Sequence, residues 1–76
     1  MLEITRKYAI HKNDFPLDGI YEYNAQVWLS VDGGKNFWYC GIGKYFKTGE
    51  EARTYIEAYE RDNGGIFDES KLLFAN

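Results

Sequence analysis

Residues 20–46 decide the fold, and they read IYEYNAQVWLSVDGGKNFWYCGIGKYF. Up to residue 31, apolar side chains alternate with polar ones, which is typical of a strand with one buried face. The side chains expected on the buried face are Tyr21, Tyr23, Ala25, Val27, Leu29 and Val31. Trp28 is the one large apolar side chain on the opposite, polar face. The pattern therefore predicts a half-buried strand over residues 20–31.

A tight hairpin turn is indicated by the sequence DGGK at residues 32–35, because glycine takes positive φ angles without steric cost. If Gly33 and Gly34 form a two-residue turn, they set the register of the next strand. The pairs expected on the core side are Leu29 with Trp38, Val27 with Cys40 and Ala25 with Ile42. The pairs expected on the opposite face are Ser30 with Phe37 and Trp28 with Tyr39. The sequence therefore predicts an aromatic cluster on the side away from the core.

The N-terminal part of the chain contains a second strand pattern that stops early. Over residues 2–10, apolar side chains recur at every second position, with Arg6 as the exception. The side chains that share this face are Leu2, Ile4, Tyr8 and Ile10. Residues 11–19 lose the alternation and contain Pro16 among polar turn formers. We expect a strand over residues 2–10 and an irregular connection over residues 11–19.

One helix is predicted in the C-terminal half. Thr48 and Glu51 match the capping box T-x-x-E, in which each side chain satisfies a backbone N–H at the helix start. The apolar stripe that follows at helical spacing comprises Ala52, Tyr55, Ile56 and Tyr59. The sequence NGG at residues 63–65 tolerates the left-handed conformation that ends a helix. Residues 72–74 are interpreted as a short strand, with a helical turn starting near Asp68 as the alternative.

These elements predict a single α+β domain over residues 1–76. We expect a small antiparallel sheet of three to four strands packed on one α-helix, in the order β-β-β-α. An additional strand after the helix is the alternative. One helix cannot cover a whole sheet, so one face of the sheet is expected to remain open.

The cysteine and histidine contents limit the chemistry of the chain. Cys40 is the only cysteine and His11 the only histidine, so an internal disulfide and a structural zinc site are both excluded. We expect no metal and no cofactor. The charged N-terminus is unlike a signal peptide, and no apolar run is long enough to cross a membrane, so a cytoplasmic location is expected.

Catalytic motifs are missing from the sequence. A cysteine nucleophile at Cys40 needs a histidine base, and His11 is the only candidate, so we interpret Cys40 as a small buried strand residue. The sequence CGIGK at residues 40–44 lacks the spacing of a phosphate-binding loop. Its glycines indicate a bend or bulge in a strand instead. We therefore expect a protein without enzymatic activity.

The net charge of −3 is unevenly distributed. Residues 1–47 hold six Lys or Arg and five Asp or Glu, whereas residues 48–76 hold three Lys or Arg and seven Asp or Glu. An acidic half disfavours binding to duplex DNA, which needs a basic surface, and it permits docking onto a basic protein. On the helix, Glu57 and Glu60 are the candidate residues for such docking. A helix face that is charged only for solubility is the alternative.

Three aromatic residues are the strongest candidates for a binding site. Trp28, Phe37 and Tyr39 on an open sheet face could anchor a protein partner, since Tyr and Trp are enriched at interfaces. They could also stack single-stranded bases, and the cations available for that role are Arg6, Lys7, Lys35 and Lys44. In a third interpretation, residues 11–19 fold back over the rings and cover them with Phe15 and Leu17.

In its overall format the chain resembles the small acidic proteins of phages and mobile elements, of which the anti-CRISPR and other anti-defence inhibitors are examples. The resemblance rests on a length of 76 residues, the hairpin at residues 32–35, one capped helix and an acidic second half. It implies a stoichiometric inhibitor that occupies a nucleic-acid-binding or partner surface on a host complex. Those proteins share no motif, so no inhibitory residue can be carried over. A single-stranded nucleic-acid-binding module and a domain that self-associates through an open edge strand are the alternatives.

Overall fold

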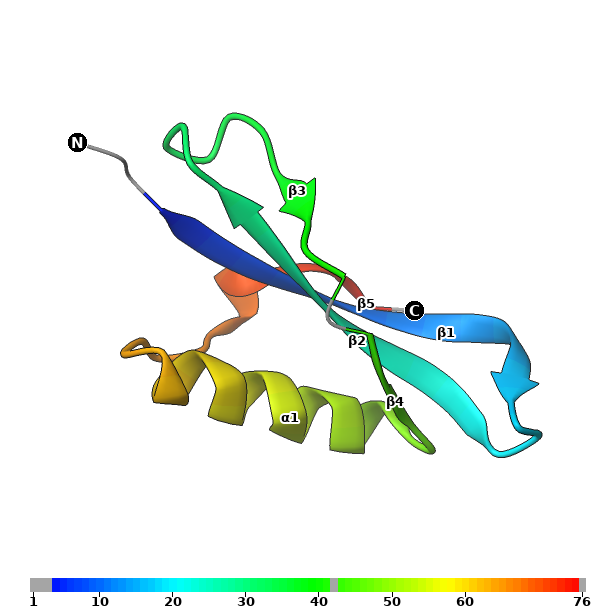
Figure 1. Ribbon diagram of the computed structural model, residues 1–76. Coiled ribbons are helices and arrows are strands. Elements are labelled where there is room, and N and C mark those ends of the chain that lie inside the picture. The colour runs from blue at the N-terminus through cyan, green and yellow to red at the C-terminus, as the bar shows by residue number, and fades with distance from the viewer. Residues whose placement is uncertain (1–3, 42, 76) are drawn as a thin grey trace.

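The computed structural model describes residues 4–41 and 43–75 and has the α+β architecture expected from the sequence (Figure 1). One α-helix packs on one face of a sheet whose strands twist strongly along its length. The elements in chain order are β1 (Thr5–Leu17), β2 (Tyr21–Ser30), β3 (Trp38–Tyr39), β4 (Lys44–Phe46), α1 (Gly49–Asp62), the 3-10 helix η1 (Glu69–Lys71) and β5 (Leu72–Ala75).

The sheet contains the antiparallel strands expected from the sequence, and one parallel strand makes it mixed. Its order is β3-β2-β1-β5. The strand β4 also pairs with β2, at a different part of that strand from β3. The pairs of β2 with β1, β3 and β4 are antiparallel, whereas β5 runs parallel to β1. Parallel strands need a crossover connection, and α1 supplies it between β4 and β5. Both interpretations of the C-terminal residues are confirmed, because the helical turn η1 leads directly into the terminal strand.

The predicted register of the β2–β3 hairpin is confirmed. Leu29 pairs with Trp38 and Trp28 pairs with Tyr39. The connection is wider than a two-residue turn, because regular pairing resumes only at Trp38. The Asp32 carboxylate organises this loop by accepting hydrogen bonds from the Ser30 hydroxyl at 2.6 Å and from the backbone N–H groups of residues 35 and 36 at 3.0 Å. These bonds, that of Ser30 first, lower the pKa of Asp32 to about 2.

The register changes beyond β3, as the glycines at residues 40–44 indicated. Ala25 pairs with Lys44 and not with Ile42, which itself lies outside the described residues. Gly41 has a φ of 73°, and the Gly43 N–H donates to the Gly41 carbonyl at 2.9 Å. This local turn separates β3 from β4 and shifts the pairing of β4 on β2 by two residues.

Residues 11–17 continue β1, so the expected irregular connection over residues 11–19 is wrong. β2 begins at Tyr21 and its first residues need partners, which β1 provides through the pairs Lys12 with Tyr23 and Leu17 with Tyr21. A bulge between Lys12 and Leu17 accommodates Pro16, whose missing N–H is tolerated where the ladder is interrupted.

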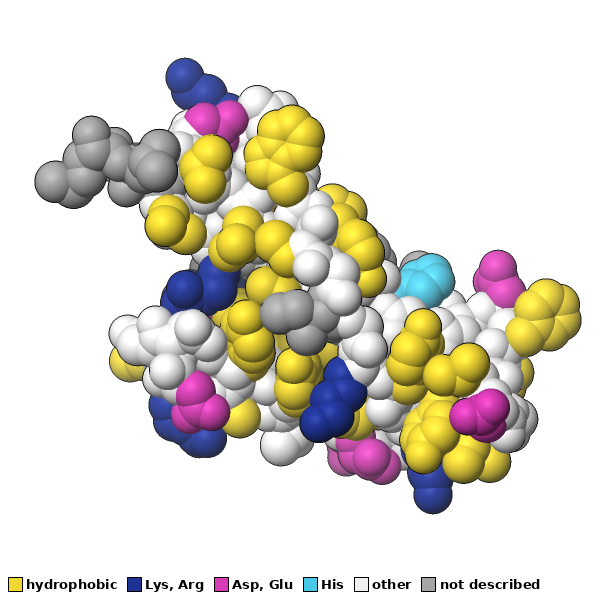
Figure 2. Space-filling model, viewed as in Figure 1, with side chains coloured by type: hydrophobic (Ala, Val, Ile, Leu, Met, Phe, Trp, Pro, Cys, Tyr) yellow, Lys and Arg dark blue, Asp and Glu magenta, His cyan; other side chains and the backbone are white. Residues whose placement is uncertain are grey.

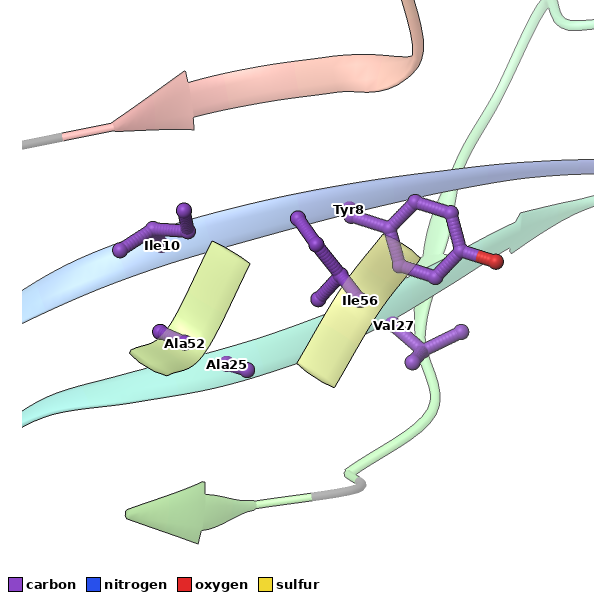
Figure 3. Packing of buried hydrophobic residues seen from close by; sticks show 6 residues of the cluster. All are labelled: Tyr8, Ile10, Ala25, Val27, Ala52 and Ile56. Atoms are coloured by element: carbon purple, nitrogen blue, oxygen red, sulfur yellow. The ribbon is translucent and has the colours of Figure 1, made fainter. Parts of the chain in front are cut away.

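The core lies between α1 and the central strands β1 and β2. Figure 3 shows the six buried side chains, which are Tyr8, Ile10, Ala25, Val27, Ala52 and Ile56. The two small residues Ala25 and Ala52 let the helix approach the sheet closely. The predicted helix cap is confirmed, because the Thr48 side chain accepts a hydrogen bond from the Glu51 N–H at 3.2 Å. Full burial of Ile56 contributes roughly 2–3 kcal/mol to folding.

The hairpin end of the sheet extends beyond the cover that α1 provides (Figure 1). Arg6 pairs with Leu29 at the level where the helix ends, and its guanidinium donates to the Asn63 carbonyl at 3.2 Å. Trp38 is 62% exposed and Cys40 is also exposed, although both were expected in the core. The reason is that β3 is a short edge strand, whereas the buried stripe of α1 packs over β1 and β2. Figure 2 shows hydrophobic side chains at the surface over this end of the molecule.

Candidate functional site

Trp28 and Tyr39 lie together on the sheet face that points away from α1. They are cross-strand partners on β2 and β3, and their ring centroids are 5.4 Å apart with an interplanar angle of 52°. Trp28 is half-buried, while Tyr39 is 52% exposed. Successive strand side chains alternate in direction, so Trp28 points opposite to its neighbour Val27, which belongs to the core under α1. The structure thus brings together the central pair of the predicted aromatic cluster.

Phe37 is connected to the other two rings by the side chain of Lys7. The Lys7 ammonium lies 5.3 Å from the centroid of the Phe37 ring, within the range of a cation–π interaction. Lys7 is the β1 partner of Trp28, so it stands on the same face of the sheet. We refer to Lys7, Trp28, Phe37 and Tyr39 as the aromatic face.

A chain of side-chain hydrogen bonds along the open side of the sheet holds the Trp28 indole in place. The Trp28 Nε1–H donates to the Gln26 Oε1 at 3.1 Å, and the Gln26 Nε2 donates to the Asn24 Oδ1 at 2.9 Å. The Asn24 Nδ2 then donates to the Asn13 Oδ1 at 2.7 Å. Each amide donates to the next in one direction, which fixes the orientation of every side chain in the series. Sequence reasoning missed this series because it placed Asn13 in a loop.

The aromatic face is not covered by residues 11–19, which corrects the third sequence interpretation. Those residues continue β1 away from Trp28, as the pairing of His11 with Asn24 shows. Phe15 is 86% exposed, and Leu17 is exposed as well. The extended backbone leaves neither side chain able to fold back over the rings.

The two acidic candidates on α1 lie on the other side of the sheet and differ from each other. Glu57 is exposed and forms an ion pair with Arg53 at 3.4 Å, one turn earlier on the helix. Glu60 is only 3% exposed, so it cannot present its charge to a partner. We therefore remove Glu60 from the candidate site, and Glu57 is not part of the aromatic face.

Glu60 is the centre of a buried polar network that ties α1 to the sheet. Its Oε1 accepts hydrogen bonds from the Arg6 Nε at 2.8 Å and from the Tyr8 hydroxyl at 2.5 Å, while its Oε2 accepts from the Lys71 Nζ at 2.6 Å. Burial alone would raise the pKa of Glu60, but the donors Lys71, Tyr8 and Arg6 outweigh it and lower the pKa to about 2. Burial and the neighbouring carboxylate raise the pKa of Tyr8 well above its usual value. In the sequence, the indication of this network was that Arg6 interrupts an otherwise apolar strand face.

The part of the chain that the structure describes lacks a cluster of metal-ligating side chains and a membrane-crossing helix. Within residues 4–41 and 43–75, no group of three or more His, Cys, Asp or Glu side chains could hold a metal ion. Over the same residues, no helix is both long and apolar enough to cross a membrane. Comparisons with protein-family models, with curated proteins and with solved structures found no match for this chain.

Proposed function

We propose that this chain is a non-enzymatic protein-binding domain that captures its partner on the aromatic face. The observation that carries the proposal is the Trp28–Tyr39 ring pair on the sheet face opposite α1, where Tyr39 is 52% exposed. Rings of this kind are enriched among the residues that dominate binding energies at protein interfaces. Both rings are carried by paired strands, which suits a surface that meets a partner without large rearrangement.

The hydrogen-bonded series behind Trp28 supports the same proposal. A side chain whose orientation is already fixed loses less conformational entropy when a partner covers it. The bond from Trp28 to Gln26 also satisfies the indole N–H within the domain, so a partner can cover the ring without stranding a polar group. Trp28 is thus prepared for burial against an apolar surface.

Single-stranded nucleic acid is a weaker fit to this face. Four cations were candidates to accompany the rings, but two of them are held on the side of α1. Arg6 is bound to Glu60, and the Lys44 ammonium lies 5.4 Å from the centroid of the Tyr55 ring on the helix. A groove that follows a nucleic-acid backbone needs a row of cations, and here Lys7 is the one in contact with the aromatic cluster. A protein partner can bind to the rings without such a row of cations.

The proposal extends to a mode of action. The format that the chain shares with phage anti-defence proteins implies an inhibitor, and binding through one rigid face suits inhibition by occupying a surface of a host or defence complex in the cytoplasm. Such a mechanism needs no reactive group. The partner of the aromatic face would then be a protein whose own binding site becomes blocked.

Affinity capture with matched variants tests the proposed function. The tagged protein is incubated with nuclease-treated host lysate, and bound proteins are identified by mass spectrometry. The variants are Trp28→Ala with Tyr39→Ala and, as the control, Phe15→Ala, which removes a more exposed ring from the far part of β1. We expect one complex to be retained by the wild type and by the control, and to be lost with the double variant. Equal retention by all three proteins would reject the aromatic face as the binding surface.

A further inference from the structure

The first residues of β1 have a strand on one side only. Thr5, Arg6 and Lys7 pair with β2, but among the described residues β5 pairs with β1 only from Tyr8 to Ile10. A pocket of about 390 Å³ adjoins this part of β1. Its lining residues are Ile4, Thr5, Arg6, Lys7, Glu60, Ser70 and Lys71. The sheet therefore has an accessible edge at this point, bordered by η1.

The pocket has more positive than negative charge. Arg6 and Lys71 share the single carboxylate of Glu60, which leaves these three groups with a net charge of +1. Lys7 also lines the pocket, but its ammonium lies 5.3 Å from the centroid of the Phe37 ring on the other face of the sheet. Asp68 also interacts with Lys71, but its carboxylate is engaged by the N–H and hydroxyl groups of Ser70. Arg6 donates to Glu60 and to the Asn63 carbonyl, and Lys71 donates to Glu60; both side chains carry more N–H donors than these bonds use.

Glu60 holds Arg6 and Lys71 in fixed positions. Both of its oxygens already accept hydrogen bonds, and the side chain is 4% exposed, so it cannot turn toward a ligand. The side chains of Arg6 and Lys71 are themselves only partly exposed, at 23% and 30%. Cations arranged in advance at the wall of a pocket bind an anion with little loss of side-chain entropy.

We propose that the edge of β1 at Thr5–Lys7 and the adjoining pocket bind an extended acidic peptide segment of a partner protein. The segment adds as a strand beside β1, and one of its carboxylates enters the pocket beside Arg6 and Lys71. Strand addition supplies backbone hydrogen bonds, while the pocket selects an acidic side chain. A free phosphate would use the cations but leave the strand edge unused. This site is separate from the rings of the aromatic face and does not depend on the function proposed for them.

Titration of the purified full-length protein with blocked synthetic peptides tests this inference, with affinity measured by calorimetry and contacts mapped by NMR amide shifts. The probes are an alternating Glu–Val peptide, the matching Gln–Val peptide, inorganic phosphate and oligothymidylate. We expect the Glu–Val peptide to bind and to shift the amides of Thr5–Lys7, Ser70 and Lys71, and to bind at least about tenfold more tightly than the Gln–Val peptide. Added salt should weaken the binding.

Charge-removing variants locate the site. Lys71→Gln should weaken binding of the Glu–Val peptide about tenfold, with its fold checked by circular dichroism. The control Lys47→Gln removes the same charge just before the N-terminal end of α1 and should have no effect. Equal affinity for the two peptides, equal effects of Lys71→Gln and Lys47→Gln, or binding of only phosphate or oligothymidylate at these residues would each overturn the proposal. If the capture experiment rejected the aromatic face as a binding surface, that result would not bear on this second site.

Discussion

The hydroxyl of Tyr8 and the carboxylate of Glu60 are 2.5 Å apart, which joins the middle of β1 to the last turn of α1 inside the protein. Tyr8 is fully buried and also belongs to the apolar core. One side chain therefore connects the hydrophobic core with the polar network around Glu60. The position of α1 on the sheet depends on both.

Replacement of Glu60 by glutamine should destabilise the fold markedly. The substitution removes the charge that Arg6 and Lys71 share, and it leaves these two cations partly buried without a counter-ion. We expect a loss of about 2–3 kcal/mol in the free energy of unfolding at pH 7, measured by urea denaturation. The control Glu57→Gln affects an exposed ion pair and should change stability by less than about 0.5 kcal/mol. Similar losses for both variants would contradict the role given to Glu60.

The contribution of Glu60 should disappear in acid. Its pKa is about 2 in the folded protein, below its usual value of 4.5, so the folded state favours the ionised form. The stabilisation is therefore complete above pH 4.5 and is lost as the pH falls toward 2, with a total of roughly 3 kcal/mol. The measurement is the difference in unfolding free energy between the wild type and Glu60→Gln from pH 6 to about 2. This difference cancels the effect of other acids such as Asp32, and a gap that stays constant with pH would refute the assignment.

A methyl group at position 65 should disturb the same network. A Cβ atom at Gly65 would overlap the Glu60 carboxylate, which its three hydrogen-bond donors keep from moving away. We expect Gly65→Ala to destabilise the protein by about 2 kcal/mol, and its effect to be much smaller in the Glu60→Ala background. Thermal unfolding of the four proteins in this double-mutant cycle gives the coupling. Additive effects would mean that Gly65 and Glu60 are independent.

The indole of Trp28 should be protected from hydrogen exchange. Its N–H is bonded to Gln26 within the ordered series of amides, whereas Trp38 in the same hairpin is largely exposed. NMR of the indole N–H groups should show slower exchange for Trp28 than for Trp38. Gln26→Ala should remove this protection while the fold survives with a loss of about 1 kcal/mol. Equal exchange of the two indoles in the wild type would contradict the fixed orientation of Trp28.

Much of the fold follows from local sequence patterns. The alternation over residues 20–31 and the capping box at Thr48 correctly predict β2 and the start of α1, because each depends on neighbours in the sequence. The glycines at 33 and 34 give the parity of β3, and parity alone places Trp28 and Tyr39 on one face. The central pair of the candidate site could therefore be predicted before the structure was known.

Most of the errors concern residues whose environment is set by distant parts of the chain. Trp38 and Cys40 alternate in step with core residues, so they were expected to be buried. Nothing in the local sequence indicates that α1 does not cover β3. Glu60 follows Ile56 by one helical turn and lies on the buried stripe. Its partner Arg6 is 54 residues away in the sequence, so no local pattern connects the two. The strand character of residues 11–17 comes from pairing with β2, which outweighs the local turn propensity around Pro16.

Site-specific photo-crosslinking tests the central claim most directly. Benzoylphenylalanine is introduced in place of Tyr39 on the aromatic face or, as the control, in place of Phe15, and the cells are irradiated. The account predicts that the probe at position 39 crosslinks to one host protein, that position 15 does not, and that Trp28→Ala abolishes the crosslink. Crosslinks from position 15 to the same protein, or none from position 39, would contradict binding through the aromatic face.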